Sequence, residues 1–206
     1  MRYGMVIDLR KCVGCNACTI ACKQENATPA EIYWGKVLQY EVGRYPNARL
    51  RFLPMLCMHC REAPCLEACP SGATYRHEGG IILVNHDLCI GCKYCVMACP
   101  YEARSYNPGD PKGYYPGQGL APNEEEGYGQ GTHPRGSIEK CTFCSHRLAQ
   151  GKEPACVATC PAGARIFGDL DDPTSQVAQL VASGEAKPRM EDLGTEPSVF
   201  YIEPEP

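Results

Sequence analysis

Sixteen cysteines in four tight runs are the residues of this chain that could do chemistry, and no cysteine lies outside a run. Thiolate groups are ligands for soft metals, including zinc and iron–sulfur clusters. Closely spaced cysteines turn their sulfurs toward one centre, which suits a metal better than a distant disulfide partner. The runs are, in order, Cys12, Cys15, Cys18 and Cys22; Cys57, Cys60, Cys65 and Cys69; Cys89, Cys92, Cys95 and Cys99; and Cys141, Cys144, Cys156 and Cys160.

The first and third runs follow the spacing C-x2-C-x2-C-x3-C, which is the bacterial ferredoxin signature. Three cysteines on a tight loop wrap one cluster, the third opens a short helix, and the fourth reaches a neighbouring cluster. The second and fourth runs stretch one gap but keep the C-x3-C-P ending; Pro70, Pro100 and Pro161 are predicted to end these helices. Lys23 replaces that proline in the first run, so its helix is predicted to continue through "KQEN".

Zinc and disulfides are the two other uses that clustered cysteines suggest. The C-x2-C units of runs two and four alone would also suit structural zinc, but zinc sites do not use the triples closed by C-x3-C-P of runs one and three. Disulfides are disfavoured because the cysteines are clustered and the N-terminus "MRYGMVIDLRKC" carries no secretory signal. Because every ligand position is cysteine, the sequence predicts four 4Fe–4S clusters.

Pairing of the runs follows from their separation. Only 19 residues lie between runs two and three, and they read as a hairpin with a turn at Gly79 and Gly80 before "IILV". Runs one and four are then left to each other across this inner unit. Because the fourth cysteine of a run serves the other cluster of its pair, four ligand sets follow. The predicted sets are Cys12, Cys15, Cys18 and Cys160 (set 1); Cys57, Cys60, Cys65 and Cys99 (set 2); Cys69, Cys89, Cys92 and Cys95 (set 3); and Cys22, Cys141, Cys144 and Cys156 (set 4).

The predicted fold is α+β, with two nested ferredoxin-like units that each bind two clusters. Residues 1–50 with 140–206 form the outer unit, residues 51–104 the inner unit, and residues 105–139 a Gly/Pro-rich insertion loop. After the last run we expect a helix capped by Asp172, beginning at Pro173 and stopping at Gly184. The segment "SVFYI" near the end is predicted to be a strand.

Several function classes are disfavoured by the same sequence. The net charge is −4 with no basic stripe, which argues against nucleic acid, and the apolar runs are far too short to span a bilayer. No phosphate loop, nucleotide fingerprint or Ser/His/Asp constellation is visible. With four cysteines per cluster, no iron is left open to substrate. We therefore expect an electron carrier and not an enzyme.

The whole chain resembles the iron–sulfur subunits of the dimethyl sulfoxide reductase family of molybdopterin oxidoreductases. Within that family it is most similar to the small subunits of polysulfide, thiosulfate, tetrathionate and arsenate reductases. The likeness covers nearly the whole chain. It is carried by "GMVIDLRKCVGCNACTIACKQEN", "CMHCREAPCLEACPSGA", "CIGCKYCVMACPYEAR", "KCTFCSHRL", "PACVATCPAGARIFGDLDDP" and "GTEPSVFYI".

This resemblance implies the ends of an electron path. One end would be a large catalytic subunit that holds the molybdopterin cofactor, with molybdenum or tungsten, which this chain does not hold. The other would be a quinol-oxidising integral membrane subunit or a soluble carrier, in anaerobic respiration. A periplasmic location, peripheral to the membrane through partners, is favoured over a cytoplasmic one. The alternative is a freestanding polyferredoxin that serves several redox enzymes.

The histidines and the cations near the cysteine runs, and the insertion loop, each have a structural and a functional interpretation. The histidines are expected to be hydrogen-bond donors or surface residues, since sixteen thiolates suffice as ligands; they are His59, His77, His86, His133 and His146. Cations flanking the cysteines either aid solubility or favour reduced clusters; they are Lys11, Lys23, Lys93, Lys140 and Arg147. The insertion loop, with the short acidic run Glu124 to Glu126, is either a solvated surface loop or a docking loop. Its tyrosines are Tyr106, Tyr114, Tyr115 and Tyr128.

Overall fold

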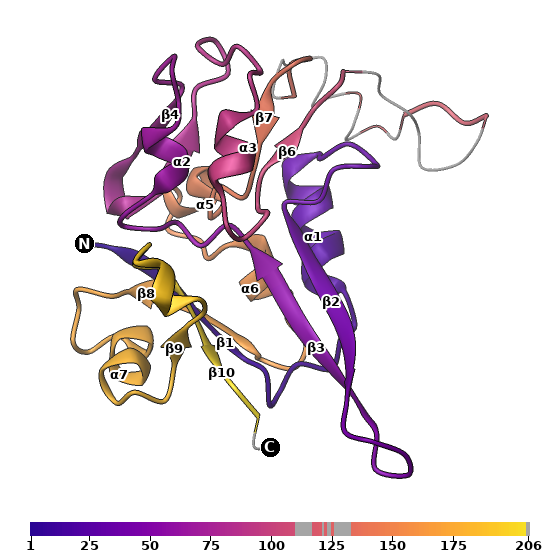
Figure 1. Ribbon diagram of the computed structural model, residues 1–206, viewed down its shortest axis with the longest axis vertical. Coiled ribbons are helices and arrows are strands. Elements are labelled where there is room, and N and C mark those ends of the chain that lie inside the picture. Colours follow the sequence, from indigo (N-terminus) through magenta and orange to yellow (C-terminus); the bar gives the residue numbers. More distant parts are fainter. Residues whose placement is uncertain (110–116, 121, 123–124, 126–132, 205–206) are drawn as a thin grey trace.

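A four-stranded sheet joins the two ends of the chain in the computed structural model (Figure 1). The structure describes residues 1–109, 117–120, 122, 125 and 133–204. Strand β1 (Tyr3–Asp8) lies between β8 (Arg165–Asp169), to which it is antiparallel, and β10 (Val199–Ile202), to which it is parallel. The short β9 (Lys187–Pro188) adds to the outer side of β10. The strand expected in "SVFYI" is thus confirmed.

Both faces of this sheet are covered, and the alternation along its strands shows how. Met5 and Ile7 point into the main core, which also contains many of the cysteines. Val6, between them, packs with Phe200 and with Val177 of helix α7 (Gln176–Ala182) in a second, smaller core. The sheet therefore supports the cysteine runs on one face and carries α7 on the other.

Helix α7 begins three residues later than predicted. The Asp172 carboxylate accepts hydrogen bonds from both the backbone N–H and the hydroxyl of Thr174, at 2.8 and 2.7 Å, and so forms a turn in place of a helix cap. Ser175 caps the helix instead, because its hydroxyl accepts from the Ala178 N–H at 3.4 Å. Gly184, with a φ of 72°, follows the end of the helix as expected.

A long hairpin that was not predicted extends from the molecule (Figure 1). Strand β2 (Gly35–Val42) pairs with β3 (Arg49–Leu56) from Gly35–Leu56 to Val42–Arg49. The far part of the hairpin is exposed, whereas Leu53 and Leu56 are buried in the main core. The boundary predicted between residues 50 and 51 falls inside β3.

The segment between runs two and three forms the predicted hairpin. Strands β4 (Thr74–Arg76) and β5 (Ile82–Val84) are antiparallel, and the 3₁₀ turn η1 (Glu78–Gly80) connects them. Gly79 has a φ of 67°, and a side chain there would meet the Tyr3 ring at 2.4 Å, so both the turn and the packing favour glycine.

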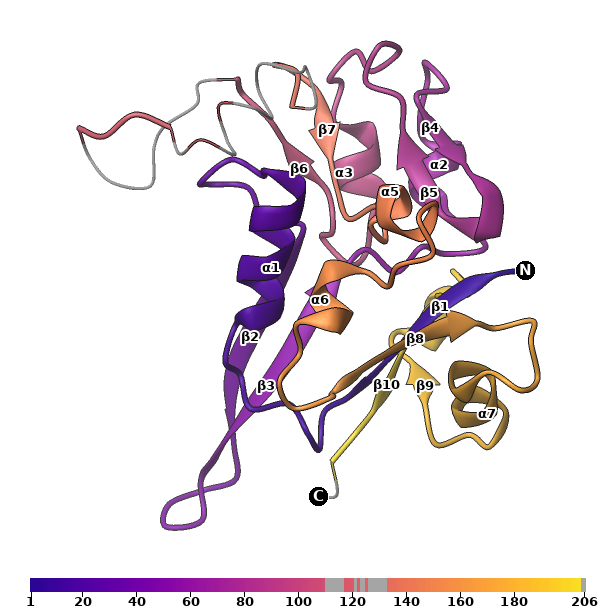
Figure 2. The same ribbon diagram turned by 180° about the vertical axis from the view of Figure 1, so that it is seen from behind.

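Short helices follow the cysteine loops, as expected, and they pack in two pairs. Helix α1 (Ala17–Asn26) continues through "KQEN" and packs against α6 (Ala155–Ala158). Helix α2 (Pro64–Glu67) packs against α3 (Tyr94–Ala98). Figure 2 shows α1 beside α6, and α2 and α3 above α6, with α5 (Ser145–Leu148) next to α3. Runs one and four thus meet through one helix pair, and runs two and three through another.

The insertion begins and ends as a small sheet, in which β6 (Ser105–Tyr106) pairs with β7 (Ile138–Glu139). Tyr106 is partly exposed on β6, whereas Tyr114, Tyr115 and Tyr128 lie outside the described residues, as do Glu124 and Glu126. One further 3₁₀ turn, η2 (Glu191–Leu193), precedes β10. In the part of the chain that is described, no helix is both long and apolar enough to cross a membrane.

Candidate metal centres

Cysteines from the first and fourth runs line two separate cavities. The first cavity lies under the loop of run one, and the second between helix α1 and the loop of run four. Three cysteines in each cavity come from one run and the fourth from the other. The first is lined by Cys12, Cys15, Cys18 and Cys160, with Arg165 and backbone of the same loops. The second is lined by Cys22, Cys141, Cys144 and Cys156, with Asn26, Trp34 and Phe143.

Cysteines of the second and third runs also approach one another. Burial, together with the charges of Cys57, Cys65 and Cys99, raises the pKa of the Cys60 thiol to about 12. Those four side chains are therefore neighbours, although they come from both runs. Burial likewise raises the pKa of Cys95, with Cys65 and Cys69 adding to the effect.

Set 3 takes cysteines from both inner runs. Cys69 and Cys95 are neighbours, and Cys89 packs against the main core that contains Cys95. Cys92 is exposed and Cys89 is half-buried. All sixteen cysteines are among the described residues, and none of them forms a disulfide.

The cysteine loops share a backbone feature that the sequence shows only in part. The residue before the second cysteine of every run adopts a positive φ: 69° at Gly14, 44° at His59, 66° at Gly91 and 51° at Phe143. This left-handed conformation turns the loop tightly enough for both cysteines to face one centre. Glycine marks it in runs one and three, but His59 and Phe143 conceal it in the other two.

Backbone N–H groups point at the sulfurs in these loops. The N–H of His59 donates to Cys57 Sγ at 3.5 Å, and the N–H of Phe143 donates to Cys141 Sγ at 3.4 Å. Donors of this kind favour a thiolate over a thiol, and hence favour metal ligation.

The last cysteines of runs two and four also accept hydrogen bonds from backbone N–H groups. Ala164 donates to Cys160 Sγ at 3.3 Å, and Thr74 donates to Cys69 Sγ at 3.4 Å. Burial alone would raise the pKa of Cys69, but its hydrogen bonds to Thr74 and Ser71 lower it to about 7. In the first run, where the helix continues, the donor is a side chain: Asn26 Nδ2 lies 3.6 Å from Cys22 Sγ and 4.0 Å from Cys144 Sγ.

Two rings join the inner and outer cysteine loops. His59 and Phe143, the left-handed residues of runs two and four, have ring centroids only 3.8 Å apart. His59 is fully buried, and its Nδ1 accepts the N–H of Ile82 at 3.1 Å. Burial lowers its pKa well below the usual range, so the ring is neutral and its hydrogen is on Nε2. Within the described residues that Nε2–H has no partner, and a cluster sulfide would supply an acceptor.

The cysteine sets follow one another in a row. Cys156 of set 4 is close enough to Cys18 of set 1 for their charges to interact. Cys141 of set 4 interacts in the same way with Cys57 of set 2. Set 2 in turn approaches set 3 through Cys65 and Cys95. The resulting order is set 1, set 4, set 2, set 3.

Most of the flanking polar residues bond to protein groups. The buried Lys23 donates to the carbonyls of Pro29, Ala30 and Ile32 at 2.7, 3.2 and 2.9 Å. His146 and Arg147 both bond to Glu25 of α1 at 2.8 Å. These side chains hold loops and helices together.

Lys140, by contrast, lies at the junction between the inner and outer runs. It is buried, and its Nζ donates to the carbonyls of Ile82 and Cys141. Its neighbours include Cys57 and Cys65 of set 2. Of the flanking cations named from the sequence, it is the one placed between two cysteine sets.

Comparison with known proteins agrees with this geometry. Residues 11–73, 48–112 and 88–165 each match a family described as a 4Fe–4S dicluster domain. The chain is 42% identical over 225 residues to the arsenate respiratory reductase iron–sulfur subunit ArrB of Shewanella sp. strain ANA-3, a match that covers 98% of this chain and 96% of that one. It is 39% identical over 204 residues to a polysulfide reductase polypeptide of Wolinella succinogenes, covering 98% and 94%.

The chain therefore belongs to the iron–sulfur subunits of the dimethyl sulfoxide reductase family. A third relative of this iron–sulfur subunit is a tetrathionate reductase polypeptide of Salmonella typhimurium, 40% identical over 205 residues that cover 98% of this chain and 72% of that one. The resemblance inferred from the cysteine runs is thereby confirmed.

The donor groups of the iron–sulfur subunit fit 4Fe–4S clusters. Thiols surround the two cavities, backbone N–H groups point at the sulfurs, and buried cations lie beside them.

Proposed function

We propose that this iron–sulfur subunit carries single electrons between a molybdopterin catalytic subunit and a quinol-linked membrane subunit or soluble carrier, in anaerobic respiration. Sets 1, 2, 3 and 4, as defined by the cysteine spacing, would each hold one 4Fe–4S cluster in two nested ferredoxin-like units. When bound, such clusters gain and lose one electron at a time, over potentials of about −700 to +450 mV. The chain itself would be non-catalytic, because all four ligands of each cluster are cysteines.

One observation carries the proposal: the two cavities of runs one and four each combine three cysteines of one run with the fourth of the other. This exchange is the arrangement that two-cluster ferredoxins use. The helix pairs α1–α6 and α2–α3 support the same exchange within each unit.

Partners are expected at the two ends of the row of cysteine sets. Cys15 of set 1 and Cys92 of set 3 are exposed. Exposed apolar side chains occur in the same stretches of sequence, Val13 and Ile20 in that of run one and Ile90 and Met97 in that of run three. An electron path needs an entry and an exit, and exposed apolar surface of this kind is typical of a docking site. A periplasmic location, reached with the partner, remains part of the proposal.

The exchange can be tested by removing the fourth cysteines one at a time. In anaerobically prepared protein, Cys22→Ala is expected to lose about one cluster's worth of iron and sulfide. Alkylation and mass spectrometry should then find Cys141, Cys144 and Cys156 newly reactive, while Cys12 and Cys18 stay protected. Cys160→Ala is the matched control, and it should expose the cysteines of run one instead.

Reactivity confined to the mutated cysteine's own run would contradict the proposed sets. A colourless preparation with zinc and no sulfide would contradict the clusters themselves. Copurification with a large molybdopterin subunit separates the fixed subunit from a freestanding polyferredoxin, which would be isolated alone and would reduce several enzymes.

A further inference from the structure

A six-residue pattern occurs twice in the chain, as "CPYEAR" at 99–104 and "CPAGAR" at 160–165. Each copy ends with an arginine five residues after the last cysteine of a run. The two turns have the same backbone: Glu102 and Gly163 have φ values of 50° and 57°. Their N–H groups donate to the carbonyls of Cys99 and Cys160 at 3.3 and 3.2 Å. The repeated turn places Arg104 and Arg165 equivalently in the inner and outer units.

Both arginines are buried, with exposed fractions of 5% for Arg104 and 7% for Arg165. Among the described residues, no carboxylate lies within ion-pair distance of either guanidinium. A buried cation is costly unless a negative charge compensates it. The groups that the two guanidiniums contact are cysteine sulfurs, Cys65 Sγ for Arg104 and Cys156 Sγ for Arg165.

Each guanidinium bridges the third cysteines of two paired runs. Arg104 Nη2 donates to Cys65 Sγ at 3.1 Å, and the same side chain hydrogen-bonds to Cys95. Arg165 Nη1 lies 3.6 Å from Cys156 Sγ, and Arg165 also hydrogen-bonds to Cys18. One arginine thus lies between sets 2 and 3, and the other between sets 4 and 1.

Supporting contacts hold the two arginines in place. Arg104 Nη1 donates to Thr74 Oγ1 at 3.1 Å, and Thr74 occupies the equivalent position in "CPSGAT" after run two. Arg165 Nη1 lies 3.5 Å from Met5 Sδ of strand β1. Arg104 Nε is buried and has no partner among the described residues, which leaves a donor free for a sulfide.

We propose that Arg104 and Arg165 are shared potential-setting residues, each of which stabilises the reduced state of both clusters in one two-cluster unit. This rests on the proposed function. An electron added to either cluster increases its negative charge, and a cation between the two lowers the cost of that charge on both sides. The same cation offsets the repulsion between the two clusters of a unit when both are reduced. The two clusters can then pass electrons on at similar potentials.

The test is an anaerobic redox titration followed by electron paramagnetic resonance, on the full chain in its complex. Arg104→Met should make two of the four clusters harder to reduce, by roughly tenfold or more in the ratio of reduced to oxidised cluster at a fixed potential. Arg165→Met should shift the other two. Arg104→Lys and Arg165→Lys keep the charge and should restore most of each shift.

Lys187→Met is the matched control. Lys187 is an exposed cation on β9, the edge strand of the four-stranded sheet, so no potential should move when its charge is removed. Variants with full iron and sulfide but parental potentials would overturn the inference while leaving the electron-transfer function intact. Loss of clusters in the Met and Lys variants alike would show a purely structural role and would also overturn it. A parent protein without four clusters would instead refute the proposed function.

Discussion

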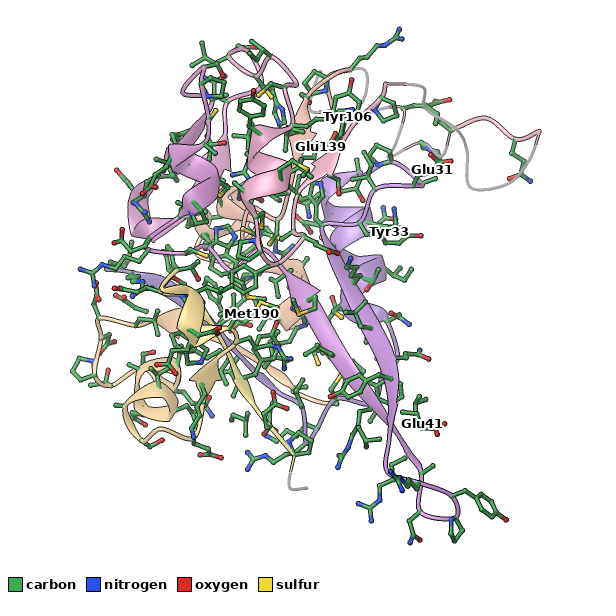
Figure 3. The ribbon with its side chains drawn as sticks, viewed as in Figure 1. Glu31, Tyr33, Glu41, Tyr106, Glu139 and Met190 are labelled. Atoms are coloured by element: carbon green, nitrogen blue, oxygen red, sulfur yellow. The ribbon has the colours of Figure 1, made fainter. Side chains whose placement is uncertain are left out.

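At the scale of single residues, Lys23 is a buried cation directly after a cysteine run, and its partners are backbone carbonyls. It stands where the other runs have proline, and its Nζ donates to three carbonyls of the segment after α1. Its Nζ also lies over the Tyr33 ring, 4.2 Å from the ring centroid; Figure 3 shows Tyr33 beside α1. The ammonium group therefore replaces water for carbonyls that the fold has buried.

Lys23→Met should reduce the free energy of unfolding by roughly 2–3 kcal/mol, because three carbonyls lose a charged donor. Lys93→Met is the matched control: Lys93 is exposed, and its Nζ stacks over the Tyr106 ring at 3.8 Å, a contact worth about 0.5–1 kcal/mol. Denaturant unfolding of the anaerobic protein would measure both. Equal losses for the two variants would contradict the role assigned to Lys23.

At the scale of elements, the cysteine loops depend on residues outside their own run. Gly91 has a φ of 66°, and a Cβ added there would lie 2.1 Å from the carbonyl oxygen of Gly136, at the end of the insertion. Gly163 has a similar φ of 57°, but nothing lies within 4 Å of an added Cβ. The two glycines therefore separate backbone strain from a clash.

Gly163→Ala should cost only about 1–2 kcal/mol, the penalty for a left-handed alanine. Gly91→Ala should cost roughly 1–3 kcal/mol more, because the loop of run three or the Gly136 backbone must move. Thermal unfolding and iron content of the two variants would measure the difference. A Gly91→Ala variant as stable and as iron-rich as Gly163→Ala would show that the insertion does not constrain this loop.

Elements set by local pattern could be predicted from the sequence. The helices that begin at the third cysteines, the β4–β5 hairpin and strand β10 lie where spacing and β-branched residues indicated. The sheet that joins β1 to β8 and β10 could not be predicted, because those pairings link residues more than 150 positions apart. The β2–β3 hairpin was not predicted, although polar and apolar residues alternate in its exposed outer half, in "QYEV" and "RLRF".

The candidate sites divide in the same way. The spacing of the cysteines named every candidate ligand, and the cysteines of runs one and four line two cavities; the assignment of each cysteine to a cluster stays a prediction. The left-handed positions of His59 and Phe143 had no sequence signal, since glycine marks that conformation only in the other runs. Arg104 and Arg165 did have one: a comparison of the chain with itself would have found the repeated C-P-x-x-A-R.

At the scale of the whole molecule, a buried acid joins segments that are distant in sequence. Glu139 accepts hydrogen bonds from Asn107 at 2.7 Å and Trp34 at 3.2 Å, and lies 3.0 Å from His133 Nδ1. His133 Nε2 in turn lies 2.8 Å from the carbonyl oxygen of Asn26, at the end of α1. Figure 3 shows Glu139 on β7, near Tyr106 of the neighbouring β6. This network ties both ends of the insertion to the outer unit.

The His133–Glu139 pair makes stability depend on pH. Burial would lower the pKa of His133, but the hydrogen bond and charge of Glu139 raise it above the ordinary 6.5. A histidine whose pKa is raised on folding contributes its full stabilisation below about pH 6.5. This contribution is lost as the pH rises through the pKa of the histidine in the folded protein. The thermal midpoint of the parent should therefore exceed that of His133→Gln most at about pH 6 and least near pH 9.

Comparing parent and variant at each pH cancels the opposite effect of histidines whose pKa values are lowered, such as His59 and His86. A gap between parent and His133→Gln that grows as the pH rises would show that the pair is not ionised in the fold.

The ends of the row of cysteine sets allow a test of how the molecule fits its partners. Ile20, on the helix α1 of run one, and Met97, on the helix α3 of run three, have exposed fractions of 63% and 85%. If each end docks a different subunit, Ile20→Glu should weaken one association and Met97→Glu the other, each by roughly tenfold or more in dissociation constant. Leu193→Glu, on the exposed turn η2, is the control and should weaken neither. Affinity measurements with purified subunits would cover all three. If Ile20→Glu and Met97→Glu weakened the same association, one partner would contact both ends of the row. The two partners would then not dock at opposite ends, and electrons would have to enter or leave by another surface.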